Sequence, residues 1–315
     1  MKMALRNCRE IYGRTLIELG QQNRDIVVLE GDLGKSTMSC YFEEAFPDRY
    51  FEMGIAEANM TAFAAGLSLA GKIPFTNSFA TFAAGRAFDQ IRQSICLPNL
   101  NVKIVGSSAG LSDYGDGSTH QSVEDIAIMR ALPNMTVLVP ADGSETRAMT
   151  RAIAAYRGPV YLRISRADLP DVTAVNQEFV MGRPSIVRGG KDAAIFAVGT
   201  MVAKAIEAAD LLSEKGISIR VVNVSSLKPV DEAALKAMAE DMKGIVTAEE
   251  HSIIGGLASL VTYVLRGTGL PIECIAIQDR FGQSAENLDR LYEEYGLTAE
   301  RIAAAAVSVI AKNTA

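Results

Sequence analysis

The chain has 315 residues, of which 49% are hydrophobic and 22% are charged, and its net charge is −6. At roughly 100–200 residues per domain, this length predicts two domains, and the composition is typical of a globular protein in solution. The negative charge and the lack of any basic cluster argue against nucleic-acid binding. No apolar segment approaches the ~20 residues that a membrane-spanning helix needs, and the early sequence has no signal-peptide pattern, so we expect no membrane association.

The cysteines indicate a reducing environment. There are four of them, widely separated and without a CxxC pair: Cys8, Cys40, Cys96 and Cys274. We therefore expect a cytoplasmic protein with neither a disulfide framework nor a zinc site.

Short β-branched strands alternate with helical patterns through the first half of the chain. The predicted strands lie at 26–29, 73–75, 102–105, 137–139 and 160–162, and the predicted helices at 59–70, 84–95, 123–130 and 143–156. Such alternation indicates parallel βα units, in which helices cover both faces of a sheet.

The alternation pauses over residues 166–190, where two prolines and a Gly-Gly pair interrupt any period, and we interpret this stretch as a linker. A second set follows, with strands at 193–198, 218–222, 245–248 and 272–276 and helices at 202–215, 231–241, 256–266, 285–295 and 299–310. The sequence therefore predicts two parallel-sheet α/β domains. We place them at residues 1–168 and 185–315, joined by a linker at 169–184.

Two residues are candidates for proton transfer. Glu57 lies just before the predicted helix at 59–70, although the helix dipole alone also favours an acid there. His120 lies in a long polar loop, where functional residues are common, and imidazole titrates near neutral pH. A surface histidine without function is the alternative. The other histidine, His251, is expected in a surface or interface loop.

Five segments in the first half resemble motifs of the transketolase family, in the same order and at matching spacing. They are VLEGDLGKS (28–36), FPDRYFEMGIAEANM (46–60), SFATF followed by GRAFDQIR (78–92), GDGSTHQ with the following Glu-Asp (115–125), and LPNM with the following Pro-Ala-Asp (132–142). The second half, through DRFG (279–282), resembles the C-terminal domain of that family. The chain is therefore similar to the C-terminal half of transketolase, and the diphosphate-binding N-terminal domain is expected on another chain.

The resemblance implies thiamine diphosphate as the cofactor. Glu57 matches the acid that protonates N1′ of the aminopyrimidine, which lets the cofactor's own 4′-imino group take the proton from C2 of the thiazolium. Phe82, with Phe79 nearby, matches the aromatic platform under this ring, and core packing is the alternative for both. Asp32 matches a residue that borders the cofactor site.

The resemblance also implies substrate contacts. His120 matches a histidine that contacts a substrate oxygen, and Asp116 matches an aspartate that binds the C2 hydroxyl of the sugar. Three more residues match phosphate contacts of the family: Arg9, Ser36 and Arg166. A guanidinium can bind phosphate through two hydrogen bonds, although a solvated surface charge is the alternative for a lone arginine.

Two features depart from the family pattern. Ser108 stands where the family usually has a phosphate-binding histidine, so the substrate either carries no phosphate there or binds it differently. The GDG at 115–117 resembles the start of a metal–diphosphate motif, but Asn134 follows too early to complete it. We therefore predict no metal ligand in this chain.

The resemblance implies a split transketolase in an α2β2 hetero-oligomer. A partner subunit with the N-terminal domain supplies the ligands for Mg²⁺ and the diphosphate, and the substrates are sugars or sugar phosphates. The beta subunit of a 2-oxo-acid dehydrogenase and half of a deoxyxylulose-phosphate synthase share the glutamate, the platform and the domain order, but the GSTHQ loop favours transketolase over the dehydrogenase. A non-catalytic subunit that keeps the fold for assembly is the third alternative.

Overall fold

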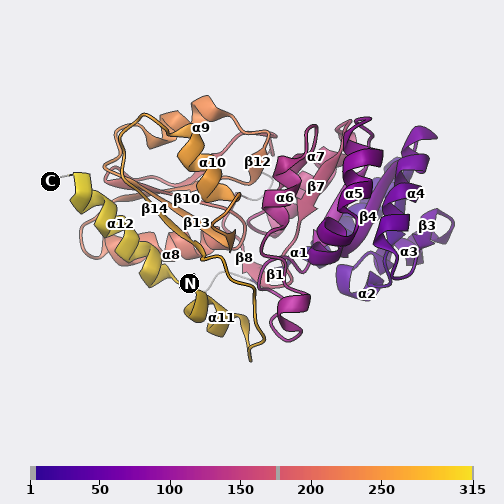
Figure 1. Ribbon diagram of the computed structural model, residues 1–315, viewed down its shortest axis with the longest axis horizontal. Helices are drawn as coiled ribbons and strands as arrows, with labels where there is room; N and C mark the ends of the chain where they lie inside the picture. Colours follow the sequence, from indigo (N-terminus) through magenta and orange to yellow (C-terminus); the bar gives the residue numbers. More distant parts are fainter. Residues whose placement is uncertain (1–4, 175–177, 314–315) are drawn as a thin grey trace.

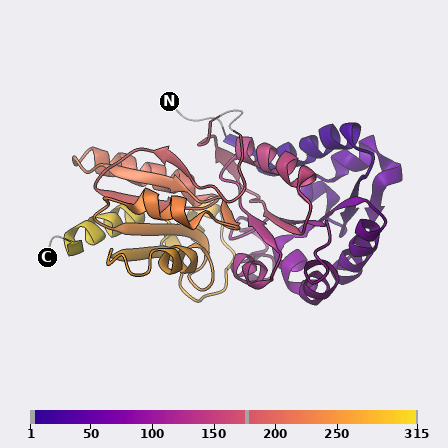
Figure 2. The same cartoon turned by 90° about the horizontal axis from the view of Figure 1, so that it is seen from above.

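Two large sheets lie side by side in the computed structural model, which describes residues 5–174 and 178–313 (Figures 1 and 2). The first sheet has the order β12 (Ser226–Lys228), β6 (Thr136–Leu138), β7 (Val160–Arg163), β5 (Lys103–Ser107), β4 (Ile73–Phe79), β2 (Ile26–Glu30) and β3 (Tyr50–Glu52). The second has the order β14 (Ile272–Ile277), β13 (Ile245–Ser252), β10 (Ala193–Ala197), β11 (Ile219–Asn223) and β9 (Ser185–Arg188). All neighbours are parallel except β12–β6 and β11–β9, which confirms the predicted α/β class.

Helices cover both faces of the first sheet because its strands are apolar on both sides. Val28 packs into one core, whereas its neighbours Val27 and Leu29 point to the opposite core. The first core includes α1 (Cys8–Gln22), α3 (Cys40–Ala45) and α7 (Gly143–Ala155). The second includes α4 (Glu57–Leu69), the helical segment at 82–96 and α6 (Asp125–Ala131).

The second sheet is covered in the same way. Ile195 packs with α8 (Met201–Ser213), α11 (Leu288–Tyr295) and α12 (Ala299–Asn313). The adjacent Phe196 packs on the opposite face with α9 (Glu232–Ala239) and α10 (Leu257–Val264). That core is continuous with the α4 side of the first sheet, so one body of apolar side chains links the two halves.

Strand β12 also links the halves. It belongs to the second half in sequence, yet it pairs antiparallel with β6 at the edge of the first sheet. Lys228 in β12 donates hydrogen bonds to the carbonyl oxygens of Arg130 and Leu132. The relative position of the halves is therefore fixed by backbone pairing as well as by apolar contact.

Three local expectations need correction. The helix predicted at 84–95 consists of two π-helical segments, Phe82–Arg86 and Ile91–Cys96, around the short α5 (Phe88–Gln90). The predicted linker at 166–190 contains β9 and also β8 (Asp168–Pro170), which pairs with β1 (Leu5–Asn7). Helix α1 was not predicted.

His251 does not lie at the surface. It is fully buried in β13, and its Nε2 accepts a hydrogen bond from the amide of Ala127 in α6, so it lies at the junction of the two halves. Burial lowers the pKa of His251 to about 4. Among the described residues, no helix is long and apolar enough to cross a membrane.

Candidate active site

Most of the predicted site residues lie at or just beyond the carboxyl ends of strands in the first sheet. In chain order they are Asp32 and Ser36 after β2, Glu57 after β3, Phe79 at the end of β4 and Phe82 beyond it, Asp116 and His120 after β5, and Arg166 after β7. Because these strands are parallel, their carboxyl ends share one edge, which is where open α/β sheets bind ligands. Arg9 reaches the same edge from the first turn of α1.

Glu57 is the first residue of α4, and its side chain is only 2% exposed. Its Oε1 accepts a hydrogen bond from Ser78 Oγ at 3.3 Å. Both of its carboxylate oxygens lie 3.2 Å from Nη1 of Arg86, a side chain that is 51% exposed. The carboxylate is thus enclosed by protein and contacts one hydroxyl and one half-exposed cation.

Arg86 also connects this carboxylate to a group of aromatic rings. The rings of Phe79 and Phe82 are nearly parallel, with an interplanar angle of 14° and centroids 6.1 Å apart. The His120 ring meets both edge-on, at 5.3 Å from Phe82 and 6.1 Å from Phe79. The Arg86 guanidinium lies over the Phe82 ring, 4.2 Å from its centroid. We call Glu57, Phe79, Phe82, Arg86 and His120 the Glu57 cluster.

A second cluster contains the three predicted phosphate contacts. Arg9, which is 8% exposed, donates from Nη1 to the carbonyl of Ser36 at 2.7 Å and from Nη2 to the carbonyl of Arg166 at 3.4 Å. Nη1 of Arg166 donates to Oδ2 of Asp113 at 3.1 Å. Burial, followed by the charge of Arg166, lowers the pKa of Arg9. The fold therefore brings Arg9, Ser36 and Arg166 together, with Asp113 beside them.

The remaining predicted residues are less tightly held. Asp32 is exposed at a φ of 64°, and its amide donates to Glu52 Oε1 at 2.9 Å. Asp116 is exposed just before a 3-10 turn. Ser108 is fully buried at a φ of 51°, and its Oγ has no hydrogen-bond partner within the described residues. No hydrogen bond in the described part of the chain joins Asp32 or Asp116 to Glu57 or Arg9.

Three residues at this edge were not predicted as site residues. Arg86 and Asp113 lie inside the quoted motif and loop, but only the fold shows that they face Glu57 and Arg166. Glu30, at the end of β2, is fully buried and accepts hydrogen bonds from the Gly31 amide at 2.9 Å, Thr37 Oγ1 at 2.7 Å and Ser39 Oγ at 2.5 Å. Burial raises the pKa of Glu30 to about 7. Glu30 therefore fixes the loop that carries Asp32 and Ser36.

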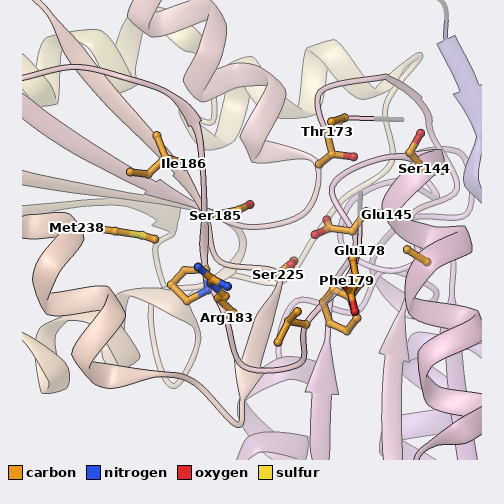
Figure 3. Close-up of a pocket in the computed structure, with 14 residues that line it drawn as sticks. Ser144, Glu145, Thr173, Glu178, Phe179, Arg183, Ser185, Ile186, Ser225 and Met238 are labelled. Atoms are coloured by element: carbon orange, nitrogen blue, oxygen red, sulfur yellow. The ribbon is translucent and has the colours of Figure 1, made fainter. Parts of the chain in front are cut away.

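A separate cavity of about 360 Å³ lies where α7 meets the start of the second half (Figure 3). Figure 3 shows Glu145 on α7 and Phe179 and Arg183 from the following segment around it. None of the predicted site residues lines this cavity. In the described part of the chain, no three His, Cys, Asp or Glu side chains are grouped to hold a metal ion.

Each half of the chain matches a known protein family. Residues 5–172 match the family described as transketolase, pyrimidine binding domain, and residues 182–302 match transketolase, C-terminal domain. The chain belongs to the transketolase family. The resemblance to this family that the sequence motifs indicated is confirmed. Membership of the family implies thiamine diphosphate as the cofactor.

The proteins similar to this chain include transketolase subunits of about the same length. A putative transketolase C-terminal section from Methanocaldococcus jannaschii is 45% identical over 299 residues, covering 94% of this chain and 93% of the relative. A 6-deoxy-6-sulfo-D-fructose transketolase subunit from Clostridium sp. is 41% identical, covering 96% and 94%. A solved structure described as a split gene transketolase, inactive beta4 tetramer, superposes with a TM-score of 0.88 at 47% identity, covering 98% and 99%. The chain thus resembles the C-terminal subunit of a split transketolase.

Proposed function

We propose that the chain is the catalytic C-terminal subunit of a cytoplasmic split transketolase, which transfers a two-carbon ketol unit from a ketose to an aldose. The bond between C2 and C3 of the ketose breaks, a bond to the aldehyde carbon of the acceptor forms, and no net oxidation occurs. The observation that carries the proposal is the buried Glu57 carboxylate, which Arg86 connects to the Phe82 ring, with the His120 ring packed edge-on against Phe82.

The Glu57 cluster fits the aminopyrimidine end of thiamine diphosphate. A carboxyl group enclosed by protein can share a proton with N1′ of that ring, and Phe82 offers a flat aromatic face for it. When bound, the cofactor supplies the nucleophilic carbon that attacks the ketose carbonyl. We propose that His120, at the edge of the same rings, hydrogen-bonds a substrate oxygen close to that carbon.

Arg86 occupies the position that this proposal assigns to the aminopyrimidine. Its guanidinium covers the Phe82 ring and contacts both oxygens of Glu57. The side chain is 51% exposed, so it can turn towards solvent, and N1′ of the cofactor would then replace it as the partner of the buried Glu57 carboxylate. We infer that Arg86 leaves the ring when the cofactor binds.

The diphosphate and Mg²⁺ are assigned to a partner subunit that carries the N-terminal domain, in an α2β2 assembly. Two relatives support this assignment, because one is named a C-terminal section and one a split gene transketolase. We also propose the domain limits 1–168 and 185–315, with 169–184 between them. The two sheets support this division, although β12 crosses to the first sheet.

Replacement of Glu57 by Gln in the complex with the N-terminal subunit tests the proposal. The assay is ketol transfer from D-xylulose to D-ribose and between the two 5-phosphates, with products identified by mass spectrometry. We expect Glu57→Gln to lower kcat by about 10²–10⁴-fold, because an amide cannot supply the proton. The exposed Glu44→Gln is the matched control.

Three outcomes would contradict the proposal. Full activity of Glu57→Gln would favour the non-catalytic assembly subunit. Decarboxylation of 2-oxo acids without ketol transfer would favour the dehydrogenase alternative. Tight binding of thiamine diphosphate and Mg²⁺ by the isolated chain would refute the division of the site between two subunits.

A further inference from the structure

Asp113 occupies an unexpected position beside the predicted phosphate contacts. It lies in the loop after β5, its side chain is 5% exposed, and its Oδ2 accepts a hydrogen bond from Nη1 of Arg166 at 3.1 Å. Arg166 follows β7, the neighbouring strand of the same sheet. The Asp113 carboxylate therefore already accepts a hydrogen bond from the Arg166 guanidinium, the group that the family resemblance assigns to phosphate binding.

The surrounding hydrogen bonds hold this ion pair in place. The carbonyl of Asp113 accepts a hydrogen bond from Nε2 of Gln121 at 3.2 Å. Ser112 Oγ accepts one from the amide of Arg166 at 3.0 Å and donates to the carbonyl of Ala109 at 2.6 Å. The backbones of both partners are thus held in place, which keeps the Asp113 carboxylate and the Arg166 guanidinium within reach of each other.

The charges at this position cancel. Arg9 and Arg166 carry one positive charge each, and both hydrogen bonds of the Arg9 guanidinium go to backbone carbonyls. Asp113 contributes one negative charge, and Asp168, which also acts electrostatically on Arg9, contributes another. The two positive and two negative charges sum to zero, and the oxygens of a phosphate dianion would also approach the buried Asp113 carboxylate.

Asp113 interacts electrostatically with Asp116 and His120, the two predicted sugar contacts, in addition to its ion pair with Arg166. Its pKa is raised by burial, lowered by Arg166, raised further by Asp116 and lowered by His120. It therefore lies within electrostatic range of the two residues proposed to contact the sugar, and Asp116 adds a second negative charge. A neutral polyol suits this mixture of one carboxylate acceptor and one guanidinium donor.

We infer that Asp113 makes this site select sugars whose end remote from the carbonyl carries a hydroxyl group instead of a phosphate. This inference rests on the proposed ketol transfer. The terminal hydroxyl donates its hydrogen to Asp113 and accepts a hydrogen bond from Arg166.

The test compares acceptors in the complex with the N-terminal subunit. D-Xylulose is the common donor, and kcat/KM is measured for D-ribose and for D-ribose 5-phosphate with the wild type and with Asp113→Asn. We expect the wild type to favour ribose, and the variant to shift the ratio towards the phosphate by roughly tenfold or more, because the amide keeps the shape and removes the charge. The preference for ribose over ribose 5-phosphate is compared between the wild type and the variant, and this comparison cancels any difference in free aldehyde between the two sugars. The exposed Asp48→Asn is the matched control.

The outcomes separate this inference from the proposed function. Transfer to neither acceptor would refute the ketol transfer itself. Transfer with a wild-type preference for ribose 5-phosphate, or an unchanged ratio in Asp113→Asn, would refute the role of Asp113 and leave the transferase intact. If Asp113→Asn does not assemble, the wild-type preference decides, with kcat/KM expressed per concentration of free aldehyde.

Discussion

Replacement of Arg86 by Met tests whether this arginine competes with the cofactor. Its guanidinium lies 4.2 Å from the centroid of the Phe82 ring, and Nη1 lies 3.2 Å from both oxygens of Glu57. Methionine keeps much of the side-chain length and its apolar character but removes the charge. The Phe82 face and the Glu57 carboxylate then become available without prior displacement of a cation.

The size of the effect follows from the exposure of Arg86. Because the Arg86 side chain is 51% exposed, solvent screens its charge in both contacts, although the Glu57 carboxylate itself is only 2% exposed. A cation–π contact at an exposed position contributes about 0.5–1 kcal/mol, and an exposed ion pair about 0.2–1 kcal/mol. Together they give roughly 1–2 kcal/mol, which corresponds to about 5–30-fold in cofactor affinity.

Isothermal titration calorimetry on the complex with the N-terminal subunit measures this affinity directly. We expect Arg86→Met to lower the Kd for thiamine diphosphate, at saturating Mg²⁺, by about 5–30-fold. Arg92→Met is the control, because Arg92 is also exposed and lies six positions along the same helical segment. An unchanged or weaker affinity in Arg86→Met would refute the reasoning and show that Arg86 keeps its place when the cofactor binds.

Two further predictions concern the junction of the halves. Asp125 and Arg163 form an ion pair at 2.8 Å with side chains 0% and 5% exposed, so Asp125→Ala should lower the free energy of unfolding by about 3–5 kcal/mol, measured by urea denaturation. Arg163→Met together with Asp125→Ala should cost less than the sum of the single changes, and strict additivity would contradict the pairing. Burial lowers the pKa of His251 from 6.5 to about 4, so the unfolded chain binds a proton that the folded protein does not as the pH falls through this range. Between pH 6.5 and 4, the free energy of unfolding of the wild type should therefore fall by up to about 3 kcal/mol relative to that of His251→Gln. Burial raises the pKa of the neighbouring Glu249 to about 7, so Glu249 makes stability change with pH in the opposite direction, but it is present in both proteins. If the difference in free energy of unfolding between the two proteins stayed constant across this range, the assignment to His251 would be refuted.

Local patterns predicted most of the secondary structure. Apolar β-branched runs such as 26–29 and 245–248 became strands that are buried on both faces, because helices pack on both sides of each sheet. The predicted site residues then meet for a topological reason, since loops after parallel strands emerge at one edge. This explains why Glu57 and His120, which are 63 positions apart and were both assigned by the family resemblance, lie at the same edge.

The sequence by itself determined the α/β class, the order of the elements and the loops that carry chemistry, because these depend on residues close together in the chain. Contacts between distant segments were decided only by the tertiary structure. They include the crossing of β12 to the first sheet, the burial of His251, the cover of Phe82 by Arg86 and the pairing of Asp113 with Arg166. Each depends on how sheets, helices and side chains pack in three dimensions, and a local periodic pattern contains no such information.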